Sequence, residues 1–168
     1  MDLPCYDGQM SRDLLILLTA LLVFGGCQSV ESEVVEVLPQ TNDTEAAILS
    51  VIHDLFQGME ARDSTRIGFT LHPEALFVSV DLTQGMAKTK RTERRDFMSA
   101  VGQPGLPYIE RIHDAVVQYS GEFAEVWAPY EFYVGDSLSH CGHDAFQLVR
   151  EDQTWRILGI TYSYAACP

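Results

Sequence analysis

The chain has 168 residues, a formal net charge of −13 and a sequence pI of about 4.6. This length is enough for one domain with a hydrophobic core of its own. The excess of acidic side chains disfavours binding to nucleic acid and electrostatic adhesion to anionic lipid. Five basic residues are clustered within 88–95, and we interpret them as a solvated loop and helix start.

The N-terminal part contains an apolar run, residues 14–23 (LLILLTALLV), which Phe24 and two glycines extend to Cys27. It is too short to span a bilayer comfortably and has the length of the apolar region of a signal peptide. Its end, Val-Phe-Gly-Gly-Cys, resembles the lipobox of bacterial lipoproteins. This resemblance implies cleavage before Cys27, lipidation of that cysteine and, because Gln28 follows it, retention at the outer rather than the inner membrane.

We therefore expect three segments. Residues 1–26 form a lipoprotein signal peptide, residues 27–43 form an acidic tether, and residues 44–168 form a domain that faces the periplasm of a bacterial cell envelope. The membrane would be contacted through the lipid anchor at Cys27.

The first half of the domain reads as mainly helical. Asn42 with Glu45 three residues later has the spacing of a capping box, and apolar residues from Ile48 to Met59 repeat at helical spacing. A second, short helix is predicted from Asp63 or Ser64 to Thr70, a strand over 75–80 and a third helix over 93–101, with a polar loop at 81–92.

The second half reads as four long strands, over 108–119, 122–134, 137–150 and 154–165. Ser120-Gly121 and Gly135-Asp136, between runs rich in β-branched and aromatic residues, are hairpin signals. The fold class that follows is α+β: a curved antiparallel sheet with the N-terminal helices packed on one face, which the resemblance described below implies is the concave face of a cone.

Trial hairpin registers assign side chains to the two faces of this sheet. With two-residue turns, the inner face takes residues that mix small alanines with polar tips: Arg111, His113, Ala128, Tyr130, Cys141, His143, Ala145, Ile160, Tyr162 and Tyr164. The outer face takes Glu110, Asp114, Glu125, Trp127, Glu131, Tyr133, Asp144, Phe146 and Trp155. Gly142 or Gly159 could mark a bulge, and a bulge would invert the faces beyond it.

The inner face predicts a ligand pocket, with Arg111, His113, Tyr130, His143 and Tyr162 as candidate ligand-binding residues. His113 and Tyr130 are also the candidate catalytic pair, a histidine as acid or base and a tyrosine to polarise a carbonyl. The alternative is a hydrogen-bonded polar network without function.

No metal and no cofactor is expected. The sequence His140-Cys141-x-His143 offers only two ligands on one face of a strand, fewer than a closed zinc site needs. No nucleophile elbow, phosphate loop or dinucleotide fingerprint is present.

Cys141 and Cys167 remain as a pair once Cys5 is removed with the signal and Cys27 is lipidated. A fold-back of the C-terminal tail would bring them within disulfide distance in an oxidising compartment. The alternative is a buried free thiol at Cys141.

The chain resembles the nuclear transport factor 2-like superfamily, which includes SnoaL-like and ketosteroid-isomerase-like proteins. The resemblance rests on the element order, on Leu71-His72-Pro73-Glu74-Ala75, and on two closing patterns, Phe146-x-Leu148-Val149-Arg150 and Trp155-Arg156-Ile157. The stretch from His140 to Gly142 resembles a subgroup described as lumazine-binding. The resemblance implies a cone around a cavity, in a superfamily of enzymes and of non-catalytic binders.

Three functions follow as hypotheses: a lipid-anchored periplasmic domain that binds a small molecule, an isomerase or dehydratase that uses His113 and Tyr130, and a protein-interaction module. In the protein-interaction hypothesis, an apolar outer face would form a homodimer or dock a partner protein, through Trp127, Tyr133, Phe146 and Trp155. The ketosteroid-isomerase mechanism is disfavoured because the trial register turns every acid of the strands outward.

Overall fold

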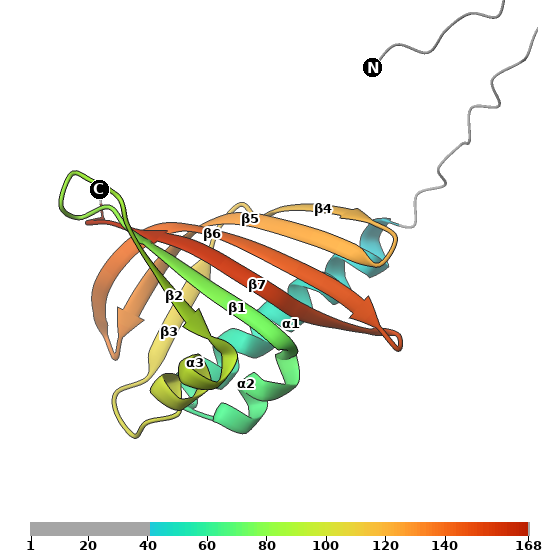
Figure 1. The fold of residues 1–168 in the computed structure, drawn as a ribbon, viewed down its shortest axis with the longest axis horizontal. Helices are drawn as coiled ribbons and strands as arrows, with labels where there is room; N and C mark the ends of the chain where they lie inside the picture. The colour runs from blue at the N-terminus through green and yellow to red at the C-terminus, as the bar shows by residue number, and fades with distance from the viewer. Residues whose placement is uncertain (1–40, 168) are drawn as a thin grey trace, which may run out of the picture. The chain divides into compact units, whose positions relative to one another are not determined.

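The computed structural model describes residues 41–167, and the predicted signal peptide, Cys27 and nearly all of the predicted tether lie outside these residues. The described chain contains three helices and a seven-stranded curved sheet that does not close (Figure 1). The predicted α+β cone is confirmed.

The helices are α1 (Thr41–Glu60), α2 (Ser64–Thr70) and α3 (Arg94–Val101). Helix α1 buries the predicted apolar stripe, with Ile48, Ile52 and Leu55 at most 1% exposed. Helix α2 begins where the carboxylate of Asp63 accepts hydrogen bonds from the backbone N–H groups of Thr65 and Arg66, at 2.9 and 3.0 Å.

The strands are β1 (Leu71–Asp81), β2 (Lys88–Glu93), β3 (Tyr108–Ile112), β4 (Val116–Ser120), β5 (Phe123–Val134), β6 (Ser137–Glu151) and β7 (Thr154–Tyr164). Their order across the sheet is β2-β1-β7-β6-β5-β3, and β4 also pairs with β5. All neighbouring strands are antiparallel except β1 and β7, which run parallel.

The strand β2 was not predicted, because residues 81–92 read as a polar loop. Its sequence, KTKRTE, is almost entirely exposed and has no apolar alternation. It pairs through its backbone with β1 at the edge of the sheet, where charged side chains are common because they discourage further pairing.

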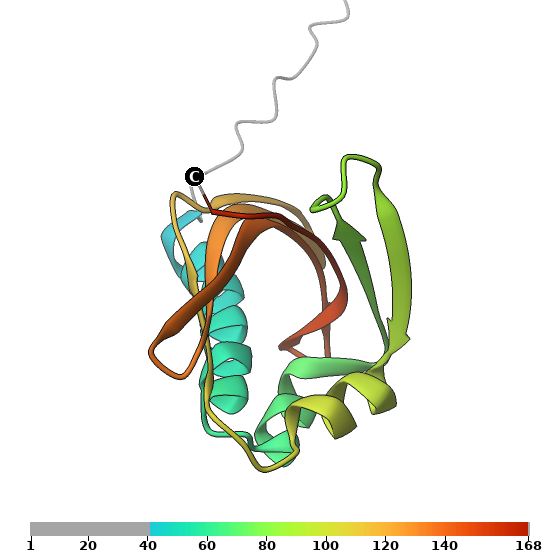
Figure 2. The same cartoon turned by 90° about the vertical axis from the view of Figure 1, so that its left-hand side faces the viewer.

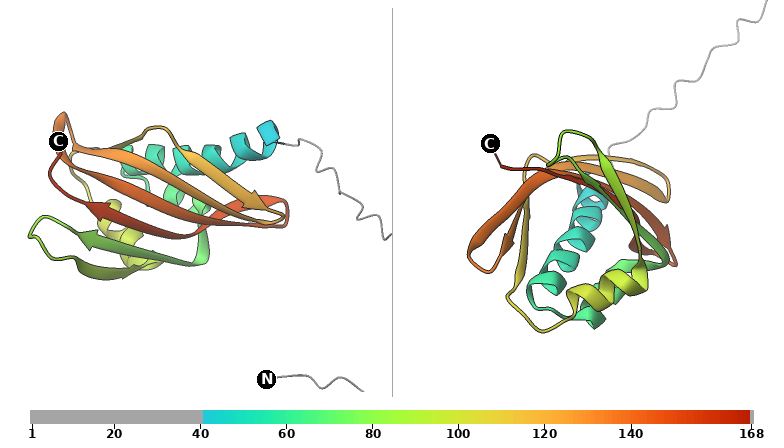
Figure 3. Two further views of the ribbon diagram at one scale, coloured as in Figure 1. Left: turned by 90° about the horizontal axis from the view of Figure 1, so that it is seen from above. Right: turned by 60° about the vertical axis from the view of Figure 1, so that its left-hand side comes forward.

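The sheet curls so that its concave face turns toward the helices (Figures 2 and 3). The views show α1 running inside the curve and α2 and α3 lying at one open side, and α1 contacts β3 and β7 while α3 contacts β1. The core lies between α1 and the half of the sheet that carries Val126, Phe146, Leu148 and Ile157.

The outer face is less apolar than predicted. Trp127 and Phe123 are exposed there, but Phe146 and Trp155, which were also expected outside, are 1% and 5% exposed and belong to the core. That expectation was wrong because the faces invert along β6 and β7, as described below. Homodimerisation through this face stays a prediction.

Candidate ligand-binding site

A cavity of about 490 Å³ lies at the end of the cone that the core does not fill. Its wall takes residues from the concave face of the sheet and from α1 and α3. Most of the wall is apolar or aromatic: Leu55, Phe56, Met59, Phe77, Phe97, Val101, Tyr108, Phe132 and Ile160. The exposed residues Lys90 and Ala100 mark the side on which the cavity reaches solvent.

Most of the polar part of the wall comes from four strands of the sheet, and β1 and β2 add Ser79, Lys90 and Thr92. Glu110 on β3, Tyr130 on β5, His140 and Asp144 on β6, and Tyr162 and Tyr164 on β7 all line the cavity. Cross-strand pairing brings them together, since Asp144 lies opposite Tyr162 and opposite Ala128, whose small side chain leaves room. These groups form a polar patch in an otherwise apolar pocket, the usual composition of a small-molecule site.

Two carboxyl groups dominate the electrostatics of this patch. Asp144 is 2% exposed, and burial raises its pKa from 3.8 to about 7. Burial, the charge of Asp144 and a hydrogen bond to it raise the pKa of Glu110 well above its ordinary value. Because two adjacent carboxylates cannot both ionise cheaply, the pair shares a proton near neutral pH, with Glu110 as the donor.

Asp144 has an unused acceptor. Its Oδ2 atom is buried and has no hydrogen-bond partner among the described residues. Buried polar atoms without a partner are rare in native structures, because each costs about 1–3 kcal/mol of desolvation. A donor group on a bound molecule would satisfy this atom.

The hydroxyl groups of Tyr130, Tyr162 and Tyr164 are already engaged within the protein, that of Tyr162 with Ser79. Tyr130 Oη donates a hydrogen bond to the backbone oxygen of Ser163 at 2.9 Å. Burial, followed by the charges of Asp144 and Glu110, raises the pKa of Tyr130. Burial also raises the pKa of Tyr162 and of Tyr164, and Tyr164 is in addition hydrogen-bonded to Asp81. All three remain neutral phenols.

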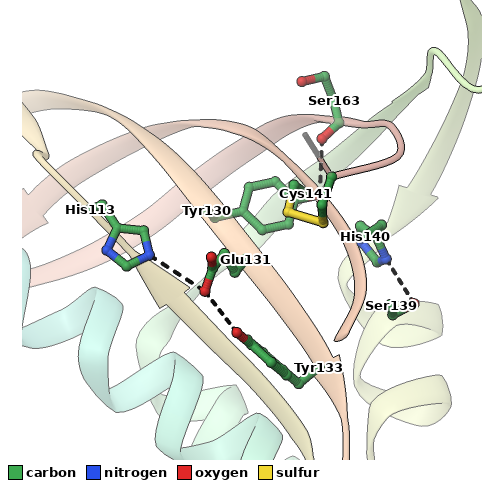
Figure 4. The surroundings of a disulfide bond; sticks show 9 residues. His113, Tyr130, Glu131, Tyr133, Ser139, His140, Cys141 and Ser163 are labelled. Carbon is green, nitrogen blue, oxygen red and sulfur yellow. Dashed lines mark hydrogen bonds and ion pairs between the residues drawn. A yellow bond between two sulfur atoms is a disulfide. The ribbon is translucent and has the colours of Figure 1, made fainter. Parts of the chain in front are cut away.

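His140 is held between aromatic rings. It stacks on Phe132 with ring centroids 4.8 Å apart and meets the rings of Tyr130 and Tyr164 edge-on at 5.8 and 5.5 Å. Its Nδ1 atom lies 3.1 Å from Ser139 Oγ (Figure 4). Partial burial lowers its pKa, so the ring is neutral at pH 7.

The structure places Tyr130 and Tyr162 in the pocket, but it does not place Arg111, His113 or His143 there. His143 stacks on Trp127, on the outer face, with ring centroids 5.2 Å apart. The expectation that these three share the face of Tyr130 was wrong. A ligand-binding role for Tyr130 and Tyr162 stays a prediction.

His113 and Arg111 instead join an outer-face cluster with Glu131 and Tyr133, of which Figure 4 shows His113, Glu131 and Tyr133. His113 Nε2 lies 3.8 Å from Glu131 Oε2, which accepts a hydrogen bond from Tyr133 Oη at 2.8 Å. The guanidinium of Arg111 lies 4.9 Å from the centroid of the Tyr133 ring. His113 and Tyr130 therefore cannot act as one catalytic pair, since they lie on opposite faces of the sheet.

An irregularity between β3 and β4 separates these residues from the pocket. Ile112 pairs with Tyr130 and Val116 with Trp127, so three residues of one strand face two of the other. The extra residue lies near Pro129, which has no N–H group to donate to the neighbouring strand. Within the bulge, Asp114 takes a left-handed conformation with φ of 44°. The bulge turns Glu110 inward and Arg111 and His113 outward.

Two further bulges explain the other misplaced side chains. The turn at Gly135-Asp136 is as predicted, but Ser139 is an extra residue in β6, so His140 and Asp144 point inward and His143 outward. Leu158 is an extra residue in β7 and inverts the face again. Tyr162 was predicted correctly because these last two inversions cancel.

The acid pair and His140 were missed by sequence reasoning, which turned Glu110 and Asp144 outward. One usable signal was Pro129 in the middle of an otherwise regular strand, since proline inside a sheet is largely confined to edges and bulges. We see no comparable sequence signal for the bulge at Ser139.

Cys141 and Cys167 form a disulfide, with Cα atoms 5.0 Å apart. Cys141 and Ala165 also exchange two backbone hydrogen bonds, at 3.2 and 2.9 Å, so the tail folds back along β6. Of the two alternatives left open by the sequence, the structure shows the bridge. It fixes the end of β7, next to the pocket residues His140 and Tyr164.

Neither a metal site nor a membrane-spanning helix is found in the described part of the chain. Between residues 43 and 167, no group of three or more His, Cys, Asp and Glu side chains is arranged to hold a metal ion. In the same part of the chain, none of the helices combines the length and the apolar character that crossing a membrane requires.

Comparison with solved structures finds the same fold at low sequence identity. A nuclear transport factor 2-like protein from Cytophaga hutchinsonii superposes with a TM-score of 0.60 at 14% identity, over 74% of this chain and 99% of that one. The β subunit of a "putative aromatic-ring-hydroxylating dioxygenase" from Novosphingobium aromaticivorans gives 0.61 at 13% identity, over 74% and 91%. A "putative scytalone dehydratase" from the same organism gives 0.56 at 12%, over 72% and 83%.

The comparison with curated proteins finds no match. The family model described as "Putative lumazine-binding" matches residues 43–163, which is most of the chain. The chain therefore belongs to this family, and it has the fold of the nuclear transport factor 2-like protein from Cytophaga hutchinsonii.

Proposed function

We propose that this protein is a lipid-anchored periplasmic domain that binds a small, partly apolar molecule in its conical pocket. One observation carries the proposal: a cavity of about 490 Å³ contains, among apolar walls, a buried carboxylate oxygen of Asp144 without a partner. The volume is in the range of ligand pockets, about 300–1,000 Å³. A ligand that donates to Asp144 Oδ2 would offset the desolvation of that atom.

The proposed location in the periplasm is supported by the N-terminal sequence and by the disulfide. The Val-Phe-Gly-Gly-Cys sequence that ends at Cys27 resembles a lipobox, and an acidic stretch follows it. The Cys141–Cys167 disulfide fits an oxidising compartment such as the periplasm. The family description, which names lumazine, agrees with a small-molecule ligand.

The binding proposal is tested by native mass spectrometry of the purified chain, combined with a thermal-shift screen of aromatic compounds. We expect a retained or added compound on the parent chain and a reduced amount on Asp144→Asn. His113→Ala is the control, because its side chain is on the outer face, and it should bind as the parent does. If no compound is retained and none raises the Tm, the proposal is wrong.

The anchor is tested by labelling growing bacteria with a radioactive fatty acid. The parent chain should be labelled and should fractionate with membranes, and Cys27→Ser should lose both properties. A Cys27→Ser chain that keeps its label would refute lipidation at that residue.

A second candidate function is proton transfer on a bound carbonyl compound. The favouring observation is the acid pair, because a carboxyl group with a pKa of about 7 inside a pocket is suited to act as an acid or base at neutral pH. Asp144 and Glu110, with Tyr130, would then replace the pair first expected from the sequence. The likeness to the protein described as a "putative scytalone dehydratase" concerns the fold alone, so the proposal of proton transfer depends on the acid pair.

This candidate is tested by following deuterium exchange next to the carbonyl in a panel of small ketones by NMR. The parent chain should exchange faster than buffer, and Asp144→Asn should lose the excess. Equal rates for the parent and for buffer across the panel would remove the enzymatic hypothesis and leave the binding proposal intact.

A further inference from the structure

We propose that the ligand of this pocket carries a basic nitrogen, held as an ammonium group against Glu110 and Asp144 and between the aromatic rings beside them. The inference rests on the small-molecule function proposed above and specifies its ligand. It concerns the deep end of the cavity, where β3, β5, β6 and β7 contribute side chains.

The acid pair at this end of the pocket presents an acceptor rather than a donor. The hydroxyl proton of Tyr130 goes to Ser163, and the hydroxyl groups of Tyr162 and Tyr164 are paired with Ser79 and Asp81. The proton of Glu110 goes to Asp144, whose Oδ2 is left without a partner. A ligand group that meets this oxygen must therefore donate a hydrogen bond, and an ammonium group has only donors.

Aromatic rings lie next to both acids. Tyr162 lies opposite Asp144 in the sheet, and Phe132 lies opposite Glu110. Tyr130 lies near enough to both acids for their charges to raise its pKa. Ring faces attract cations within about 6 Å, and the attraction is strongest when the cation is shielded from water. Carboxylates and rings together discriminate against anions.

The charged and titratable groups that line this cavity also favour a cationic ligand. Glu110 and Asp144 are the acids, and the pKa of His140 is lowered, so that this ring is neutral at pH 7. The tyrosines are neutral, and α1 and α3 contribute no titratable side chain to the lining. Lys90 is the one cation; it is exposed at the rim, where solvent screens it.

Proton release is a direct consequence of this arrangement. An empty pocket holds a shared proton between the two carboxyl groups. An arriving ammonium supplies positive charge and its own donors, so the pair can give up that proton to bulk water. Binding of a cation should therefore release up to one proton, whereas a neutral ligand should release none.

The test uses three probes that share one ring system and differ in charge: 1-naphthylmethylamine, 1-naphthylmethanol and 1-naphthoate. Binding to the full chain is measured by isothermal titration calorimetry at pH 7, in two buffers of different ionisation enthalpy. We expect the amine to bind at least about tenfold more tightly than the alcohol, and the carboxylate most weakly. Only the amine should show a buffer-dependent heat, which reports proton release.

Two variants separate the acid pair from the rim. Asp144→Asn should reduce the preference for the amine to about threefold or less, a loss of at least about 0.7 kcal/mol in discrimination. Lys90→Gln should keep the ranking and tighten the amine slightly. A Lys90→Gln chain that binds its best probe more weakly would show that the ligand is anionic and would overturn the inference.

The possible failures are distinguishable. If the alcohol or the carboxylate binds as tightly as the amine, the basic nitrogen is wrong, while binding of a small molecule in the pocket stands. If none of the three probes binds and the mass spectrometry described above finds no retained compound, both proposals fall.

Discussion

Replacing Asp144 by asparagine tests the buried acid pair through protein stability, without any ligand. The side chain is 2% exposed, and its pKa rises from 3.8 to about 7 on folding because burial disfavours the carboxylate. Between these two values the folded chain holds a proton that the unfolded chain has lost. The free energy of unfolding of the parent must then fall as the pH rises through this window.

The expected magnitude follows from the two pKa values. At 1.36 kcal/mol per pH unit, the distance from 3.8 to about 7 corresponds to about 4 kcal/mol for this one group. Asparagine has nearly the same shape, can still accept the hydrogen bond from Glu110 through its amide oxygen and does not titrate. The parent should therefore lose stability relative to Asp144→Asn by up to about 4 kcal/mol between pH 4 and pH 7.

The assay is urea denaturation followed by circular dichroism at four or five pH values over this range. Subtracting the two curves removes the general effect of the net charge of −13, which both chains share apart from the one substituted group. Glu125→Gln, which changes an exposed acid on the outer face, is the matched control and should run parallel to the parent. Parallel curves for the parent and Asp144→Asn would refute the raised pKa and the shared proton.

Three further predictions concern the frame around the pocket. Gly142→Ala should destabilise the fold by about 1–3 kcal/mol, because a Cβ atom there would lie 1.8 Å from the backbone oxygen of Ser163. An unchanged urea midpoint would contradict this close approach. Changing Cys141 and Cys167 together to serine should cost about 3.5 kcal/mol, the value for a loop closed over a sequence separation of 26, and equal unfolding free energies for the two chains would show that the bridge contributes nothing. Asp63→Ala should cost about 1 kcal/mol by removing the cap of α2, measured as a lower Tm, and an unchanged Tm would mean that the two backbone N–H groups are satisfied by water.

The sequence determined the elements whose signals are local. The stripe from Ile48 to Met59 gave α1, and Asp63 marked the start of α2. The hairpin turn at Gly135 has φ of 60°, a conformation that favours glycine. These signals depend only on residues close in the chain, so the order of the helices and the long strands, and with it a curved α+β sheet, could be predicted; the cone shape was implied by the family resemblance. The edge strand β2 was missed because its side chains carry no burial pattern.

The tertiary structure decided which side chains face the cavity. A strand has a period of two, so a single extra residue exchanges its faces, and where a bulge forms depends on the neighbouring strand as well as on the strand itself. The bulge opposite Pro129 moved His113 out of the pocket and Glu110 into it, and the one at Ser139 did the same for His143 and Asp144. The pairing of two acids that are 34 residues apart in sequence, and the loss of water around them, exist only once four strands are assembled.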